Sequence, residues 1–196
     1  MNVTHGLRRA LQINPHGLAT VFQNRRRTWT EIGDRVARLA SGLQSLGVSE
    51  GDRVALLMLN SDRYLELYLA AAWAGAVIVP LNIRWSPLEN EDALRDCRAK
   101  VLVVDAAFAA TGDALAKALP DIKLVFADDT DTPAGMETYE ALIARSNSVA
   151  DAMRKASDLA GIFYTGGTTG RSKGVMLSHQ NLMANALNAL GEGMFP

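Results

Sequence analysis

The chain has 196 residues, of which 48% are hydrophobic and 21% charged, with a formal net charge of −1 at pH 7. This balance is typical of a globular protein of one domain, or one and a half, with a sizeable core. The near-neutral charge and a pI near 6.3 exclude the strongly basic surface that nucleic acids and anionic membranes attract.

The cysteine and histidine content narrows the class of protein further. The single cysteine, Cys97, precludes a disulfide within the chain, favours a reducing compartment and is expected to be a packed thiol. The histidines, His5, His16 and His179, are too scattered to suggest a metal site. Residues 1–17 lack the apolar core of a signal peptide, and no apolar run approaches the roughly 18 residues that span a bilayer. The sequence therefore predicts a cytoplasmic protein without a membrane span.

The first elements follow a polar lead-in. The segments LATVFQ and RTWT are expected to form a short hairpin, and we interpret the three arginines at residues 25–27 as a solvated turn. A helix is predicted to begin near Thr30, because apolar residues recur every three or four positions. These residues are Ile32, Val36, Leu39, Leu43 and Leu46. Gly47 then occupies the place of a left-handed C-terminal cap.

Strands and helices alternate along the next part of the chain. Nearly continuous apolar runs predict buried strands at residues 51–59, 76–80, 100–105 and 123–128, with helices at 62–74, 86–99 and 113–120. The second of these helices opens with Ser86 as N-cap, Pro87 at the first helical position and Glu89 as the partner of a capping box. The alternation predicts an α/β fold with a mostly parallel sheet covered by helices on both faces.

The last third of the chain begins with a polar stretch. Residues 127–136 predict a loop that would mark an internal domain edge, and 136–146 predict a helix. Residues 147–158 fit either a helix or a connecting segment. The chain then closes with a predicted β-hairpin and a helix. Its strands are LAGIFYT and GVMLSH, and Ser178 is the expected N-cap of the final helix.

The tip of this hairpin has an unusual composition. The segment GGTTGRSK offers glycines, whose backbone N–H groups can converge on an anion without obstruction by Cβ atoms. Hydroxyl and cationic side chains accompany them: Thr165, Thr168, Thr169, Arg171 and Lys173. A plain hairpin needs only about two to five turn residues, so a phosphate-binding loop is favoured over a flexible turn.

Two common phosphate loops do not fit. A Walker A loop requires a lysine directly after its last glycine, but Arg171 and Ser172 separate Gly170 from Lys173. The dinucleotide fingerprint fails as well, because Gly167 has no glycine two residues further on.

A third pattern fits closely. The stretch YTGGTTGRSKGV resembles the signature loop of the acyl-adenylate-forming (AMP-binding) enzymes, whose consensus is [YF]-T-[SG]-G-[ST]-T-G-x-P-K-G-V. These enzymes include acyl-CoA synthetases, luciferases and peptide adenylation domains. Only Ser172 departs from the core positions, standing where proline is usual. The resemblance extends through RTWTEIGDRVARLASGLQSLGVSEGDRVALLMLN and YLAAAWAGAVIVPLN, and thus covers most of the chain.

The resemblance implies ATP-dependent activation of a carboxylic acid, with Mg²⁺, followed by thioester formation with coenzyme A. The residues that it assigns to ATP are Thr165, Gly166, Gly167, Thr168, Thr169, Gly170, Arg171, Ser172 and Lys173. Thr165 is also the implied Mg²⁺ ligand, directly or through water. Lys173 is interpreted as an electrostatic clamp, because the adenylation lysine of the family lies in a C-terminal domain. No catalytic residue is therefore expected here.

The resemblance also implies that residues 1–196 form part of the large N-terminal AMP-binding domain, without the C-terminal domain and inactive alone. Three alternatives stay open: a non-enzymatic half that forms a homo-oligomer through exposed apolar surface, an adenylation domain with a carrier-protein acceptor, and an unrelated phosphotransferase with a variant loop. The identity and length of the carboxylic acid cannot be read from the sequence.

Overall fold

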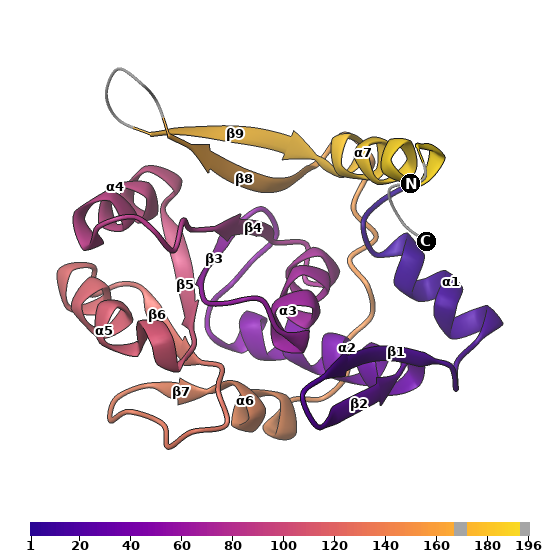
Figure 1. Cartoon of the computed structure of the whole chain (residues 1–196), viewed down its shortest axis with the longest axis horizontal. Helices are drawn as coiled ribbons and strands as arrows, with labels where there is room; N and C mark the ends of the chain where they lie inside the picture. The colour runs from indigo at the N-terminus through magenta and orange to yellow at the C-terminus, as the bar shows by residue number, and fades with distance from the viewer. Residues whose placement is uncertain (167–171, 193–196) are drawn as a thin grey trace.

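The computed structural model describes residues 1–166 and 172–192 (Figure 1). Its helices are α1 (His5–Ile13), α2 (Trp29–Ser45), α3 (Asp62–Trp73), α4 (Pro87–Cys97), α5 (Ala109–Ala118), α6 (Tyr139–Arg145) and α7 (His179–Gly191), with a 3₁₀ turn η1 (Ala106–Phe108). Its strands are β1 (Leu18–Phe22), β2 (Arg25–Thr28), β3 (Arg53–Leu57), β4 (Val77–Pro80), β5 (Ala99–Val104), β6 (Lys123–Phe126), β7 (Glu137–Thr138), β8 (Leu159–Thr165) and β9 (Lys173–Ser178). None of the described helices is long and apolar enough to cross a membrane.

Seven strands form the main sheet, in the order β7-β6-β5-β3-β4-β8-β9. All neighbouring pairs are parallel except β8 and β9, which form an antiparallel hairpin at one edge. The five strands β4-β3-β5-β6-β7 have the 2-1-3-4-5 order of a doubly wound sheet. Strands β1 and β2 form a separate antiparallel ribbon. The predicted α/β fold with a mostly parallel sheet is confirmed.

Helices cover both faces of the sheet, as predicted. Side chains of β3 alternate between two hydrophobic clusters: Val54 and Leu56 join α2, α3 and α6 on one face, whereas Ala55 and Leu57 join α4 and α5 on the other. From Val54 onward β3 is buried on both faces and has no position for a polar residue, which is why that part of its sequence is an uninterrupted apolar run.

The two helices with the strongest sequence signals, α2 and α4, are confirmed. The predicted apolar stripe of α2 is fully buried at Ile32, Val36, Leu39 and Leu43. Helix α4 begins with the expected capping box, in which Ser86 Oγ accepts from the Glu89 N–H. Gly47 follows α2 with a φ of +89°, the left-handed conformation expected of a cap. Cys97 is buried at the end of α4, and burial raises the pKa of its thiol to about 11.

Several expectations need correction. The polar lead-in contains α1, which places only Leu7 in the core. Residues 25–27 are not a solvated turn: they belong to β2, and two of the three arginines form ion pairs with the buried Asp62. The short strand β7 precedes α6 where only a helix was expected. Residues 147–158, which fitted either a helix or a connecting segment, form a connecting segment, and the predicted loop at 127–136 is confirmed between β6 and β7. The domain edge assigned to that loop stays a prediction.

Candidate functional site

The hairpin of β8 and β9 presents the predicted loop. In its register, Thr165 lies opposite Lys173 at the last pair, and Tyr164 lies opposite Gly174 one rung below. Thr165, Gly166 and Lys173 are exposed, and Ser172 is half-buried. The other residues of the predicted site fall outside the described residues: Gly167, Thr168, Thr169, Gly170 and Arg171. The structure thus brings together the two ends of the loop.

The position of this hairpin in the sheet is favourable for ligand binding. Because β8 runs parallel to β4, Thr165 lies at the edge where the carboxyl ends of β3, β4 and β5 also lie (Figure 1). In open α/β sheets, ligands bind in the crevice outside the carboxyl ends of the strands. The fold therefore presents the two described ends of the loop at the edge of the sheet where such sites occur.

Lys173 supplies an available positive charge at this edge. Its side chain is exposed, and no ion pair joins it to any residue in the described ranges 1–166 and 172–192. A lysine ammonium is a mobile point charge that binds phosphate oxygens well. An anion at the hairpin tip would therefore meet a cation that is not engaged elsewhere in this part of the chain.

A groove of about 620 Å³ separates the hairpin from α4. It is lined by Glu89, Asp92, Ala93, Arg95, Asp96, Tyr164 and Ser172. Two of its carboxylates have structural duties, because Glu89 belongs to the capping box and Asp96 accepts a hydrogen bond from the Tyr164 hydroxyl. Among the described residues predicted to bind ATP, which are Thr165, Gly166, Ser172 and Lys173, only Ser172 lines this groove.

The far end of the hairpin is fixed to the N-terminus of the chain. Ser178 caps α7, with its Oγ 3.2 Å from the Asn181 nitrogen, as the sequence predicted. His179 is buried, and its Nδ1 accepts a hydrogen bond of 3.3 Å from the Val3 N–H. Burial lowers the pKa of His179 below its usual value, which favours the neutral ring that this bond requires.

Comparison with known proteins identifies the family. The model of the AMP-binding enzyme family matches residues 7–194. The chain belongs to the AMP-binding enzyme family. This finding confirms the resemblance that was drawn from the loop and the two upstream blocks.

Relatives of this AMP-binding chain include CoA synthetases and ligases. A feruloyl-CoA synthase of Amycolatopsis sp. is 40% identical over 190 residues, covering 94% of this chain and 35% of the relative. The anthranilate CoA ligase AuaEII, solved in complex with anthranoyl-AMP, superimposes with a TM-score of 0.89 at 26% identity, over 95% of this chain and 36% of its own. ATP-bound MatB from Rhodopseudomonas palustris superimposes with a TM-score of 0.81 at 34% identity. The match covers 97% of this chain and 38% of the MatB chain. The chain spans a little over a third of each.

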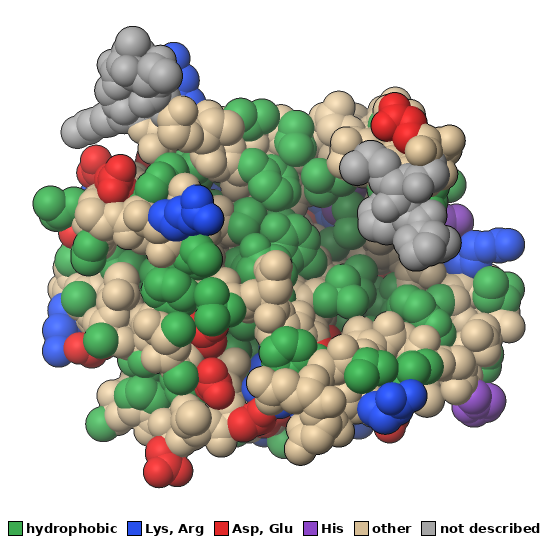
Figure 2. Space-filling model, in the orientation of Figure 1, with side chains coloured by type: hydrophobic (Ala, Val, Ile, Leu, Met, Phe, Trp, Pro, Cys, Tyr) green, Lys and Arg blue, Asp and Glu red, His purple; other side chains and the backbone are tan. Residues whose placement is uncertain are grey.

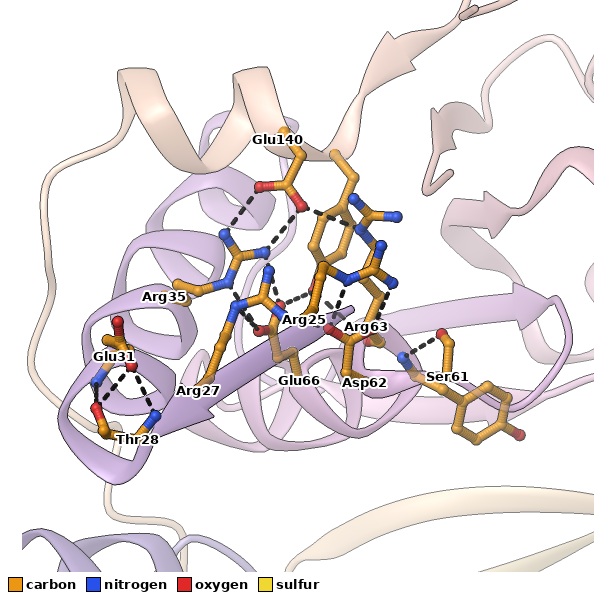
Figure 3. A network of polar contacts seen from close by, with 12 residues as sticks. Arg25, Arg27, Thr28, Glu31, Arg35, Ser61, Asp62, Arg63, Glu66 and Glu140 are labelled. Carbon is orange, nitrogen blue, oxygen red and sulfur yellow. Dashed lines mark hydrogen bonds and ion pairs between the residues drawn. The ribbon is translucent and has the colours of Figure 1, made fainter. Parts of the chain in front are cut away.

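The AMP-binding chain also contains a buried charge network that the sequence did not reveal (Figure 3). Its members are Arg25, Arg27, Arg35, Asp62, Arg63, Glu66, Tyr139 and Glu140. At its centre the fully buried Glu66 accepts bonds of 2.7 and 2.9 Å from Arg35 and one of 3.0 Å from the Tyr139 hydroxyl. Arg35 also donates hydrogen bonds of 2.8 and 2.9 Å to the Glu140 carboxylate.

The second centre of the network is Asp62, in the first turn of α3. Burial alone would raise the pKa of this carboxyl, but hydrogen bonds and charges from Arg25 and Arg27 outweigh burial and lower the pKa to about 2. The network joins β2, α2, α3 and α6 and includes none of the predicted site residues. Its partners lie 31 to 105 residues apart, so no local sequence pattern could have found them.

Proposed function

We propose that this chain forms one wall of the ATP site of an enzyme that activates carboxylic acids and transfers them to coenzyme A. The observation that carries the proposal is the juxtaposition of Thr165 and Lys173 at the exposed end of a hairpin, on the carboxyl edge of the sheet of an AMP-binding family member. The names of the relatives, which are CoA synthetases and CoA ligases, support an acid–thiol ligase.

The proposed reaction has two displacements. ATP supplies the α-phosphate that a carboxylate oxygen attacks, so that the bond to pyrophosphate breaks and an acyl-adenylate forms. The thiolate of coenzyme A then attacks the acyl carbon, and AMP leaves with the electrons of the broken bond. Displacement at phosphorus depends chiefly on positioning and charge stabilisation, which a loop of N–H groups, hydroxyls and cations provides.

We assign the β- and γ-phosphates to the hairpin tip. The assigned residues are Thr165, Gly166, Gly167, Thr168, Thr169, Gly170, Arg171, Ser172 and Lys173. Lys173 would stabilise the charge that builds on the departing pyrophosphate, and it has no competing ion pair among the described residues. Thr165 would donate its hydroxyl to a phosphate oxygen, from the strand end directly opposite Lys173.

Magnesium fits this arrangement only as a partner of the nucleotide. No group of three or more His, Cys, Asp and Glu residues within the described ranges could hold a metal ion. Mg²⁺ commonly keeps several waters and binds through substrate phosphates with one or two protein oxygens. We therefore propose Thr165 Oγ as one such oxygen, directly or through water.

Replacement of Lys173 tests the assignment. Lys173→Ala should weaken Mg·ATP binding by about tenfold in isothermal titration calorimetry, since a charge-assisted bond to phosphate is lost. Lys123→Ala is the matched control, because it removes another exposed lysine, from the amino end of β6. An unchanged affinity in Lys173→Ala would contradict the proposed role of the loop.

Turnover is not proposed for the 196 residues alone. We propose that the chain is part of an N-terminal AMP-binding domain whose catalytic residues lie elsewhere, so it should release no pyrophosphate from ATP with any carboxylate. A carrier-protein acceptor in place of coenzyme A stays an alternative. Transfer of a labelled γ-phosphate to an acceptor would instead support the phosphotransferase alternative.

We also propose a cytoplasmic location for this chain, because a single, buried cysteine is typical of proteins in a reducing compartment.

A second property, self-association, is favoured by exposed apolar surface. Strand β9 is the edge strand of the described sheet, and its Val175 and Met176 are 42% and 66% exposed. On α7, Leu187 and Leu190 are 55% and 60% exposed. Figure 2 shows hydrophobic side chains gathered in the upper middle of one face, where Figure 1 places β8, β4 and α3. We propose that such surface drives homo-oligomerisation of this chain.

A further inference from the structure

The outer part of the β8–β9 hairpin has little support from the rest of the sheet. The register between β4 and β8 records a single pair, Ile78 with Gly161, and β4 ends two residues later at Pro80. Beyond that point the hairpin continues as a two-stranded ribbon up to the pair of Thr165 and Lys173. An isolated two-stranded ribbon is marginally stable in water. Something outside the sheet must therefore fix the direction in which its end points.

Tyr164 is the side chain that connects this ribbon to α4. Its hydroxyl donates to Asp96 Oδ2 and lies 3.2 Å from the Ala93 carbonyl oxygen. Its ring meets the ring of Trp85 edge-on, with centroids 6.3 Å apart and planes inclined by 72°. Burial first, and the hydrogen bond to Asp96 second, raise the pKa of Tyr164, as expected of a phenol that is held in this bond.

The opposite strand leaves room for this ring. A Cβ atom on Gly174, which faces Tyr164 in the register, would lie 2.7 Å from Ile162 Cγ2 and 3.2 Å from Tyr164 Cζ. The ring therefore packs over the bare backbone of Gly174. Tyr164 is thus held by α4 and Trp85 on one side and by β9 on the other. The next rung toward the tip of the hairpin is the pair of Thr165 and Lys173.

We infer that Tyr164 and Asp96 are a positioning pair that orients the polyphosphate-binding end of the hairpin against α4. The effect of this pair on the affinity for the β- and γ-phosphates rests on the proposed function, in which the end of the hairpin binds those phosphates. The pair touches no phosphate itself and acts through the rung that it anchors. Loss of the pair should let Thr165 and Lys173 move together away from the edge of the sheet.

The consequence is tested by nucleotide binding. Tyr164→Phe keeps the ring and removes the hydroxyl, and Asp96→Ala removes the acceptor. Each should weaken Mg·ATP binding about tenfold, the double variant should be no weaker than either single one, and AMP binding should stay unchanged. Asp96→Asn keeps an acceptor oxygen and should retain most of the affinity. A general loss of structure would instead weaken ATP and AMP alike and would overturn the inference.

Orientation is tested separately, without nucleotide. Trypsin cleavage after the exposed Lys173, followed by mass spectrometry of the two fragments, should be several-fold faster in Tyr164→Phe and Asp96→Ala. Glu91→Gln, on the same helix, and Tyr68→Phe, in α3 and away from the hairpin tip, should be cleaved at the wild-type rate. Wild-type cleavage rates in both pair variants would overturn the positioning role. If the wild-type chain binds no ATP, the proposed function fails, and cleavage still decides whether the pair positions the hairpin.

Discussion

His179 is the residue whose protonation should matter most for the attachment of the hairpin. Its neutral Nδ1 accepts from the Val3 N–H, and its Nε2 is buried without a partner among the described residues. The charged groups that act on it are Asp158, Arg154, Asp151 and the N-terminal amine. Burial outweighs the two carboxylates and lowers the pKa of the ring. The folded state therefore binds the proton less readily than the unfolded state.

The sign of the pH dependence follows from this difference. A lowered folded-state pKa means that the contribution of His179 to stability is complete above the unfolded pKa of about 6.5 and falls as the pH drops below it. Urea denaturation should show stability falling between pH 7 and pH 5. In His179→Asn, whose amide oxygen can take the place of Nδ1 as acceptor, this fall should be shallower. An equal fall in both proteins would contradict the assigned role.

At the same scale, the arginines of β2 show what a local pattern cannot predict. Three consecutive arginines are typical of a solvated segment, yet Arg25 and Arg27 converge on Asp62, which is 35 to 37 residues away. Only the fold brings the first turn of α3 beside β2. By contrast, Ser86 and Glu89 could be predicted as a capping box, because both partners lie within one helical turn.

At the scale of elements, the charge network joins four of them through Glu66. A buried carboxylate loses its hydration, and the bonds from Arg35 and Tyr139 replace that hydration. Glu66→Gln should lower the free energy of unfolding by about 3–5 kcal/mol, because it leaves the buried arginine partly unpaired. Urea denaturation measures this loss.

The matched control for that change is Glu91→Gln. Glu91 pairs with Arg95 across one helical turn, and that arginine side chain is 54% exposed. An exposed pair of this kind contributes at most about 1 kcal/mol. Equal losses in the two variants would show that burial does not strengthen the network.

Element prediction succeeded where amphipathic periodicity or apolar runs were long. Helix α2 buries four of the five residues of its predicted stripe and leaves Leu46 partly buried at its C-cap, and β3 and β5 are buried throughout most of their length. Helix α1 was missed although Leu7 and Leu11 lie one helical turn apart and both contact the core, because the helix is short and Leu7 is its one fully buried residue. Strand β7 was missed because its two residues are defined by pairing with β6, through Val125 and Phe126, rather than by their own propensity.

At the scale of the whole molecule, the sheet order determines which segments meet. Alternating strands and helices predict a parallel sheet but not the order of its strands, since helices of similar length can cross over in either direction along the sheet. The observed order places β8 beside β4, and so brings the loop to the carboxyl edge next to α4. The Tyr164–Asp96 contact depends on that order and could not be predicted from the sequence.

Self-association is also a property of the whole molecule. Light scattering should show a mean mass that rises above 21.1 kDa with concentration, because the β9 edge and its apolar side chains can pair with another copy. Met176→Lys places a charge on this edge and should keep the mass near that of one chain. A wild-type chain that stays monomeric over a wide concentration range would contradict the proposal.

The most direct test of the central claim is a map of where ATP binds. A ¹⁵N-labelled chain titrated with Mg·ATP should show its largest amide shifts at Thr165, Gly166, Ser172 and Lys173, with little change at Glu66 and its partners. Pyrophosphate should shift the same amides, because the claim concerns the phosphates rather than the base. Shifts that gather elsewhere on the molecule, or no shifts at saturating nucleotide, would contradict the account of this hairpin as a triphosphate site.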